Sequence, residues 1–243
     1  MECADHRTIS LISHASKILL EILTKRLETK AEMFFGKTQF GFRRGCGTRE
    51  AIGVMRTLCE RSLEHDNDVY ICLVDFEKAF DRVDWVKVLP ILKSIGTDWK
   101  DTRAIVNLYM HQKSVVKVMQ EYSEESDIGR GVRQGCCMSP ILFNIYAEAM
   151  MIEAMEGIEE GIRVGGKLIY DARFVDDQGM VANTETRLQK IIDNLHRTAE
   201  QYGMRINIEK TKVMMVSRRV GQKVNIRING KSIEQVLSFK YLS

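Results

Sequence analysis

The chain has 243 residues, of which 44% are apolar and 28% are charged, and its formal net charge is +3. This composition is typical of a folded globular protein and excludes a disordered or fibrous chain. No apolar run reaches the roughly 18 residues that a membrane-spanning helix needs, and the first residues carry Glu2 and Asp5 where a signal peptide has a basic start. We therefore expect a soluble, intracellular protein without membrane contact.

Cysteine spacing and charge distribution give weaker information. The six cysteines form no CxxC pair and no cluster with histidine at zinc spacing, so we expect reduced thiols. Residues 203–243 hold nine lysines and arginines against two acidic residues. This basic segment is compatible with a bound polyanion and equally with a solvated basic face. The oligomeric state is unknown from the sequence.

The N-terminal half predicts helices on both sides of a loop, followed by strands. Apolar residues recur at helical spacing in residues 14–32 and again after Thr48. Residues 36–47 between them are rich in glycine and arginine and indicate a loop. The β-forming run 69–76 predicts a buried strand, and residues 114–119 predict another.

The C-terminal half predicts one long helix and then several short hairpins. Ser139 and Pro140 are typical of a helix start, and this helix runs to Met155. The remaining predicted elements are a hairpin at 162–170, a tight connection at 176–179, a helix at 184–203, strands at 212–217 and 224–228, and a turn at 229–230. Because helices and strands do not alternate strictly, we expect an α+β fold with an antiparallel sheet in one continuous domain.

Three carboxylates occupy unusual places in this pattern. Asp75 ends an apolar strand, where a buried charge without a partner costs several kcal/mol. Asp176 and Asp177 are adjacent in a tight connection, and they repel each other unless a cation holds them. Asp is also common in ordinary turns, which explains the pair without any ligand. Together the three favour a site for two Mg²⁺ ions roughly 3.5–4 Å apart, which activates a 3′-hydroxyl and stabilises a leaving pyrophosphate.

Several motifs resemble those of reverse transcriptases of non-LTR retrotransposons. Residues 73–81, 131–143 and 174–177 occur in the order and at the rough spacing of that family. Residues 7–11 and 39–43 resemble its fingers motifs, and residues 203–212 and 239–242 resemble the two motifs after the catalytic Asp pair. The resemblance covers nearly the whole chain.

The resemblance implies the fingers and palm of a right-hand polymerase, with an antiparallel palm sheet backed by helices. The implied fingers are residues 1–66 and about 84–128. The implied palm is residues 67–83 and 129–243, ending in a primer-grip hairpin, and a thumb is absent.

The resemblance also implies the metal ligands and the proton donor. Asp75 and Asp176 would hold two Mg²⁺ ions, for which Mn²⁺ could substitute, helped by the Phe76 carbonyl and by Asp177. Lys210 would protonate the leaving pyrophosphate.

Further residues are implied to bind the substrates. Phe80 matches the aromatic steric gate that rejects a 2′-hydroxyl, although it could equally be ordinary core. The implied contacts to template or incoming nucleotide are Arg7, Arg43, Gln134 and Gly135, and the implied primer contacts are Phe239, Lys240, Tyr241 and Leu242.

These motifs predict an RNA-directed DNA polymerase that uses an RNA template, a DNA primer and deoxynucleoside triphosphates, acting in the nucleus. Phe174 and Val175 depart from the family's usual Tyr-Ala before the Asp pair. Val175, Pro90 within a helical pattern and the missing thumb motivate an alternative, a catalytically silent nucleic-acid-binding remnant. An RNA-templated RNA polymerase is a third possibility, because Asp81 fits the acidic residue of that class.

Overall fold

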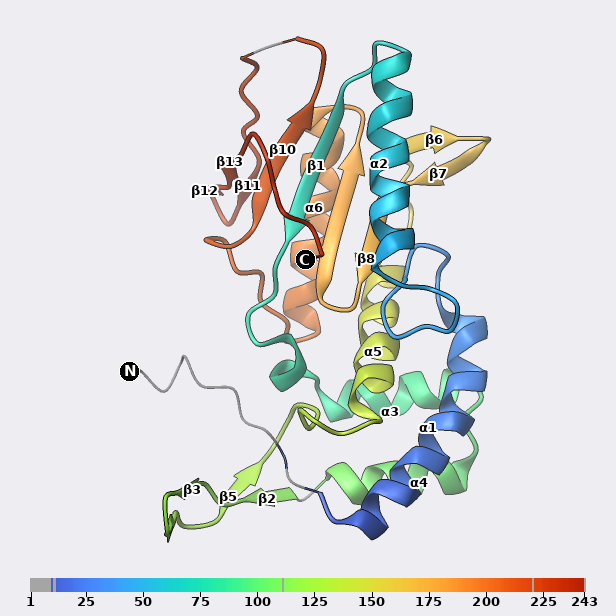
Figure 1. The fold of residues 1–243 in the computed structure, drawn as a ribbon, viewed down its shortest axis with the longest axis vertical. Coiled ribbons are helices and arrows are strands. Elements are labelled where there is room, and N and C mark those ends of the chain that lie inside the picture. Colours follow the sequence, from blue (N-terminus) through green and yellow to red (C-terminus); the bar gives the residue numbers. More distant parts are fainter. Residues whose placement is uncertain (1–9, 11, 111, 220, 243) are drawn as a thin grey trace. The chain divides into compact units, whose positions relative to one another are not determined.

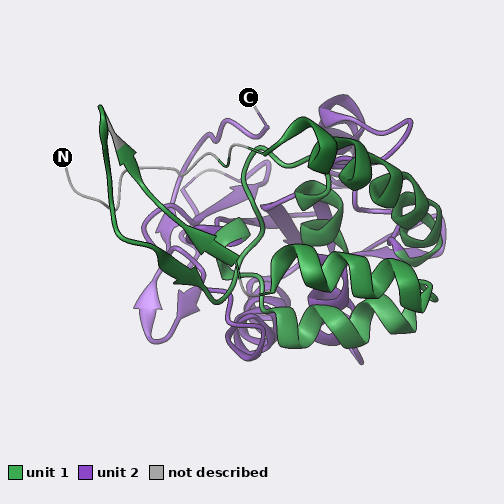
Figure 2. Cartoon of the chain, turned by 90° about the horizontal axis from the view of Figure 1, so that it is seen from below, with its two compact units in different colours: residues 1–34, 80–146 green, residues 35–79, 147–243 purple. Residues whose placement is uncertain are grey.

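The computed structural model describes residues 10, 12–110, 112–219 and 221–242. The chain forms two compact units, coloured separately in Figure 2. Unit 1 contains residues up to Phe34 and residues 80–146, and unit 2 contains residues 35–79 and 147–243. Residues 35–66, expected in the fingers, thus belong to the same unit as the main sheet, and the boundaries of fingers and palm stay a prediction.

Unit 1 is mainly helical. Its helices are α1 (His14–Phe34), α3 (Trp85–Ser94), α4 (Trp99–Tyr109) and the first half of α5 (Ser139–Ala154). A short 3₁₀ turn, η2 (Ala79–Arg82), precedes α3. Asp84 and Asp98 cap α3 and α4 by accepting hydrogen bonds from Val86 N and Lys100 N. The sequence predicted α1 correctly, but Ile18, Leu19 and Ile22 of the predicted apolar stripe are exposed.

Two short antiparallel ribbons complete unit 1. β2 (Gln112–Ser114) pairs with β5 (Ser126–Ile128), and β3 (Lys117–Val118) pairs with β4 (Glu121–Tyr122). The predicted strand 114–119 is therefore wrong as one continuous element. It is interrupted at Val116, whose backbone N–H donates to the Ser123 hydroxyl.

Unit 2 is built on a five-stranded sheet in the order β13-β10-β1-β9-β8 (Figure 1). The strands are β1 (Val69–Val74), β8 (Asp171–Phe174), β9 (Asp177–Ala182), β10 (Lys212–Val216) and β13 (Glu234–Gln235). The pairings of β1, β8, β9 and β10 with one another are antiparallel, as expected, whereas β13 pairs parallel to β10. β1 therefore lies between β9 and β10, and this strand order decides which residues meet at the end of β1.

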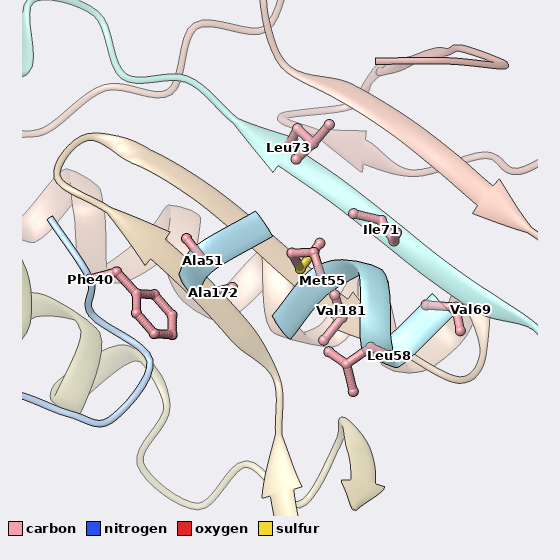
Figure 3. Close-up of a cluster of buried hydrophobic side chains, with 9 residues drawn as sticks. All are labelled: Phe40, Ala51, Met55, Leu58, Val69, Ile71, Leu73, Ala172 and Val181. Atoms are coloured by element: carbon pink, nitrogen blue, oxygen red, sulfur yellow. The ribbon is translucent and has the colours of Figure 1, made fainter. Parts of the chain in front are cut away.

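Helices α2 (Thr48–Glu64) and α6 (Glu185–Gln201) cover opposite faces of this sheet (Figure 1). Thr184 caps α6 by accepting a hydrogen bond from Arg187 N, which confirms the predicted start. Under α2, a cluster of buried side chains joins the helix to the sheet (Figure 3). Its members are Phe40, Ala51, Met55, Leu58, Val69, Ile71, Leu73, Ala172 and Val181.

Two further hairpins were predicted from their turn residues and are confirmed. β6 (Ile162–Val164) and β7 (Lys167–Ile169) are joined by Gly165 and Gly166, and β11 (Arg227–Ile228) and β12 (Lys231–Ser232) by Asn229 and Gly230. Asn229 and Gly230 both have positive φ, as a type I′ turn requires. The strand expected at 224–228 is shorter than predicted. None of the helices in the described ranges combines the length and apolarity needed to traverse a bilayer.

Candidate active site

Asp75 directly follows the central strand β1, and its backbone is held on both sides. Asp75 N donates to the hydroxyl of Thr211, which is fully buried, at 3.3 Å. Asn207 N donates to Asp75 O at 2.8 Å, and Glu77 N donates to Arg205 O at 2.9 Å. The loop that follows α6 therefore sets the direction in which the chain leaves β1.

Asp176 and Asp177 lie at the tip of the β8–β9 hairpin. Phe174 pairs with Asp177, so Val175 and Asp176 form a two-residue turn. On the next strand Gln178 pairs with Val74, and continuing this register sets Asp177 against Asp75. The pairing of β1 with β9 thus brings together carboxylates that are far apart in the sequence.

The three carboxylates interact electrostatically. The pKa of Asp177 is raised above its ordinary value, first by partial burial of its carboxyl and then by the negative charges of Asp176 and Asp75. Burial and the charges of Asp177 and Asp171 also raise the pKa of Tyr241. Negative charge is therefore concentrated at this end of the sheet.

A pocket of about 220 Å³ opens beside these residues. It is lined by Leu73, Val74, Asp75, Asp177, Gln178, Lys210, Phe239 and Tyr241. Five residues selected from the sequence thus line one pocket, although they come from four separate stretches of the chain. Asp176 does not line it and occupies the adjoining turn.

The residues at this end fit a divalent cation only in part. Within the described ranges, no three His, Cys, Asp or Glu side chains are arranged as a closed metal site. In phosphoryl-transfer sites Mg²⁺ is held by one or two carboxylates together with waters and substrate phosphates, so a closed protein cage is not required. The pKa of Asp177 is raised first by burial and then by repulsion from Asp176 and Asp75, and a cation would relieve this repulsion.

Residues 239–242, expected as a primer-grip hairpin, have no strand structure. Instead the Tyr241 hydroxyl donates to the carbonyl of Ala172 at 3.0 Å, and Leu242 packs against the cluster under α2. Phe239 and Lys240 are exposed. The segment is therefore anchored by side chains to β8, and its role as primer contact stays a prediction.

The loop 131–138 in unit 1 is tightly held at its start. Gly131 has φ +91°, and a Cβ there would lie 2.9 Å from the backbone of Asp81. Gly131 N donates to Val83 O, and the Trp85 indole donates to Gly131 O at 2.9 Å. Further along, Gln134 is half-buried and Gly135 is exposed, and their nucleotide contacts stay predictions.

Phe80 is held by an aromatic stack in unit 1. Its ring lies parallel to that of Phe143 in α5, with centroids 4.6 Å apart and an angle of 11° between the planes. Phe80 remains half-buried, so one part of the side chain is open to solvent. A fixed and partly open ring is compatible with the steric-gate prediction.

Of the two arginines predicted to bind substrate, Arg43 belongs to the described residues. Arg7 lies outside the described residues. Arg43 donates through Nη1 to the carbonyl oxygens of Gly36 and Gln39, at 2.7 and 3.3 Å. Its guanidinium thus supports the loop of its own unit, and a role in phosphate binding stays a prediction.

A buried charge cluster behind the hairpin was missed from the sequence. Arg173 of β8 lies 2.7 Å from the carboxylate of Asp171 and 3.1 Å from that of Glu148 in α5, and all three side chains are almost fully buried. Burial disfavours the charged form of Arg173 and so acts to lower its pKa. The two carboxylates have the larger combined effect, and the pKa of Arg173 is raised. The available signal was a pair of charges in a short hairpin strand and two acidic residues, Glu148 and Glu153, in an otherwise uncharged helix.

Comparisons with known proteins identify the family of the chain. Residues 2–243 match the family model described as "Reverse transcriptase (RNA-dependent DNA polymerase)". The chain is 26% identical over 98% of its length to the RNA-directed DNA polymerase from mobile element jockey of Drosophila melanogaster, and 27% identical over 91% to the Pol polyprotein of the retrotransposable element R2DM of the same species. It spans about a quarter of the former and a fifth of the latter, at 26% and 21% of their lengths.

Among solved structures, the fold is similar to that of apo telomerase from Candida tropicalis. The TM-score is 0.61 at 16% identity, over 90% of this chain and 44% of that one. These matches confirm the α+β polymerase fold and the resemblance to non-LTR retrotransposon enzymes. The chain therefore belongs to the reverse transcriptase family of RNA-directed DNA polymerases.

Proposed function

We propose that this chain is a reverse transcriptase module that adds deoxynucleotides to the 3′ end of a DNA primer paired with an RNA template. The observation that supports it best is the meeting of Asp75 and Asp177 beside one pocket that Lys210 and Tyr241 also line. Phosphoryl transfer needs positioning and charge neutralisation more than covalent help from the protein. An acidic strand end next to a lysine supplies both.

Asp75 and Asp176, with Asp177 and the Phe76 carbonyl in support, are the residues proposed to hold two Mg²⁺ ions. When bound, the ions would activate the primer 3′-hydroxyl and neutralise the leaving pyrophosphate. Thr211 and the 205–207 backbone hold Asp75 in its direction, and the hairpin register holds Asp177 beside it.

Lys210 is proposed as the proton donor to the pyrophosphate. It is exposed, lines the pocket, and its backbone N–H donates to the Asn207 side chain at 3.2 Å. Phe239 and Tyr241 are proposed to contact the primer, and Phe80 to exclude the 2′-hydroxyl of a ribonucleotide. A nuclear site of action belongs to the same proposal and is tested by cell fractionation.

The test is extension of a labelled DNA primer on an RNA template with Mg²⁺ and deoxynucleotides. The wild-type chain is compared with Asp176→Asn, and a second form carries a duplex-binding domain added after Ser243. Extension that is lost in Asp176→Asn supports the proposal. Absence of extension in both forms, with folding verified by circular dichroism, contradicts it.

Two other readouts distinguish the alternatives. Salt-sensitive primer–template binding that is indifferent to Asp176→Asn, without extension, indicates a silent binding remnant. Preferential incorporation of ribonucleotides indicates an RNA polymerase. Each outcome is separate from the extension of deoxynucleotides that we expect.

A further inference from the structure

The turn that carries Asp176 has an unfavourable backbone conformation. Val175 has φ +61°, in the left-handed region that β-branched residues strongly avoid. It is also buried, with 5% of its surface exposed. Such a conformation persists only where the surrounding structure enforces it, so the contacts around Val175 decide where Asp176 lies.

Residues 38–41 run along the outer edge of β8, which ends the five-stranded sheet. Arg173 N donates to Thr38 O at 2.8 Å, and Phe40 N donates to Arg173 O at 2.9 Å. Gln39 and Arg173 thereby form a parallel bridge. The segment extends the sheet by one short strand-like stretch that ends beside the turn.

The side chain of Gln39 reaches from this segment to the turn. Its Oε1 accepts hydrogen bonds from Gly41 N at 3.0 Å and from Val175 N at 3.4 Å. Val175 N lies outside the β8–β9 ladder because Val175 is a loop residue. Gln39 therefore supplies an acceptor that the sheet does not provide.

The Gln39 side chain is fully buried, and its Nε2 has no hydrogen-bond partner within the described part of the chain. An unpaired buried donor is unfavourable, so an apolar residue would suit the core better. What glutamine adds at this position is the oxygen, which accepts hydrogen bonds from Val175 N in the turn and from Gly41 N.

Gly41 lies against the same turn. A Cβ at position 41 would fall 2.6 Å from Val175 N and 2.4 Å from its Cγ2. No side chain fits there without moving the Val175 backbone. Gly41 and Gln39 thus both confine Val175, Gly41 by close contact and Gln39 by a hydrogen bond.

We propose that Gln39 is a positioning residue for the Val175–Asp176 turn, which holds Val175 in the left-handed conformation and so sets the place of the Asp176 carboxylate. The inference rests on the proposed function for its effect on catalysis. Its structural part, the hydrogen bond from Val175 N to the Gln39 side chain, is independent of any activity.

The structural test is amide hydrogen exchange in Gln39→Met, which keeps the length of the side chain and removes the oxygen. Exchange at Val175 N should accelerate at least tenfold, while Phe40 N and Arg173 N, which bond to backbone carbonyls, stay protected. Unchanged exchange at Val175 overturns the proposal. If Gln39→Met fails to fold, Gln39→Glu retains an acceptor oxygen and should keep Val175 protected, and loss of protection there overturns the proposal as well.

The catalytic test is a double-mutant cycle with Val175→Gly, because glycine adopts positive φ without strain. In the wild-type background, Gln39→Met should lower kcat about tenfold with little change in the KM for deoxynucleotide. In the Val175→Gly background, the same substitution should lower kcat less than twofold. An equal loss in both backgrounds means a general packing role and overturns the proposal. If neither the wild type nor the form with the added duplex-binding domain incorporates nucleotide, the proposed function fails, while amide exchange still decides the role of Gln39.

Discussion

The Arg173 guanidinium lies 3.1 Å from the Glu148 carboxylate, with about 4% and 3% of the two side chains exposed. This contact ties the strand before the Asp pair to helix α5, and Asp171 adds a second carboxylate at 2.7 Å. In such a site each charge depends on the others, because burial removes water as an alternative partner.

Arg173→Met should therefore destabilise the protein strongly. Two buried carboxylates lose their cation, and the expected decrease in the free energy of unfolding is about 3–5 kcal/mol. Urea denaturation measures it. The matched control is Glu125→Gln, which breaks the pair between Lys113 and Glu125 at 2.9 Å on the surface, where a change below about 1 kcal/mol is expected. Similar losses in both variants would contradict this account.

Asp75→Asn should reduce primer extension by on the order of a hundredfold or more, because it removes charge where the metals and phosphates are proposed to bind. The rate of single-nucleotide incorporation is the measurement. Asp66→Asn is the control, since Asp66 is exposed and precedes β1 at its opposite end. Full activity in Asp75→Asn would exclude the proposed site.

Thr211→Val tests how Asp75 is held. The valine keeps the shape of the side chain but removes the oxygen that accepts from Asp75 N, and loss of this hydrogen bond should cost about 1 kcal/mol of stability. Incorporation should fall as well. Thr211→Ser retains the hydroxyl and should behave like the wild type in both thermal unfolding and extension, whereas equal behaviour of the two variants would speak against the role of the hydrogen bond.

Phe80→Val should weaken discrimination between ribo- and deoxynucleotides by about tenfold or more, which corresponds to about 1.4 kcal/mol. The ring that stacks on Phe143 is lost, and space opens for a 2′-hydroxyl. Competitive incorporation of the two nucleotide types measures the ratio. Phe80→Tyr keeps the ring and should keep the discrimination; an unchanged ratio in Phe80→Val would make Phe80 ordinary core.

The decrease in folding stability at alkaline pH should depend in part on Tyr202. Its hydroxyl donates to Glu153 at 2.9 Å, and burial together with this carboxylate raises its pKa to about 12, above its ordinary value of 10. The folded state thus keeps a proton that the unfolded state loses, so stability falls as pH rises from about 10 to 12. Tyr202→Phe should remove this component in thermal unfolding series, and an unaltered alkaline slope would refute it.

Local sequence patterns predicted much of the secondary structure. The turn residues Asn229 and Gly230, the cap Thr184 and the apolar run of β1 each act over a few neighbours, so their effect can be read without the rest of the chain. The strand predicted at 114–119 failed, because Val115 and Val116 have high β propensity but no ladder partner there. Helix α4 was not predicted at all.

The sequence by itself determined that acidic residues end β1 and lie at the tip of the β8–β9 hairpin, and which motifs accompany them. Only the tertiary structure decided that β1 pairs with β9, that residues 38–41 lie along β8, and that Glu148 meets Arg173. The physical reason is range: caps and turns depend on adjacent residues, whereas strand order and the pairing of buried charges depend on contacts between distant segments that form only when the core closes.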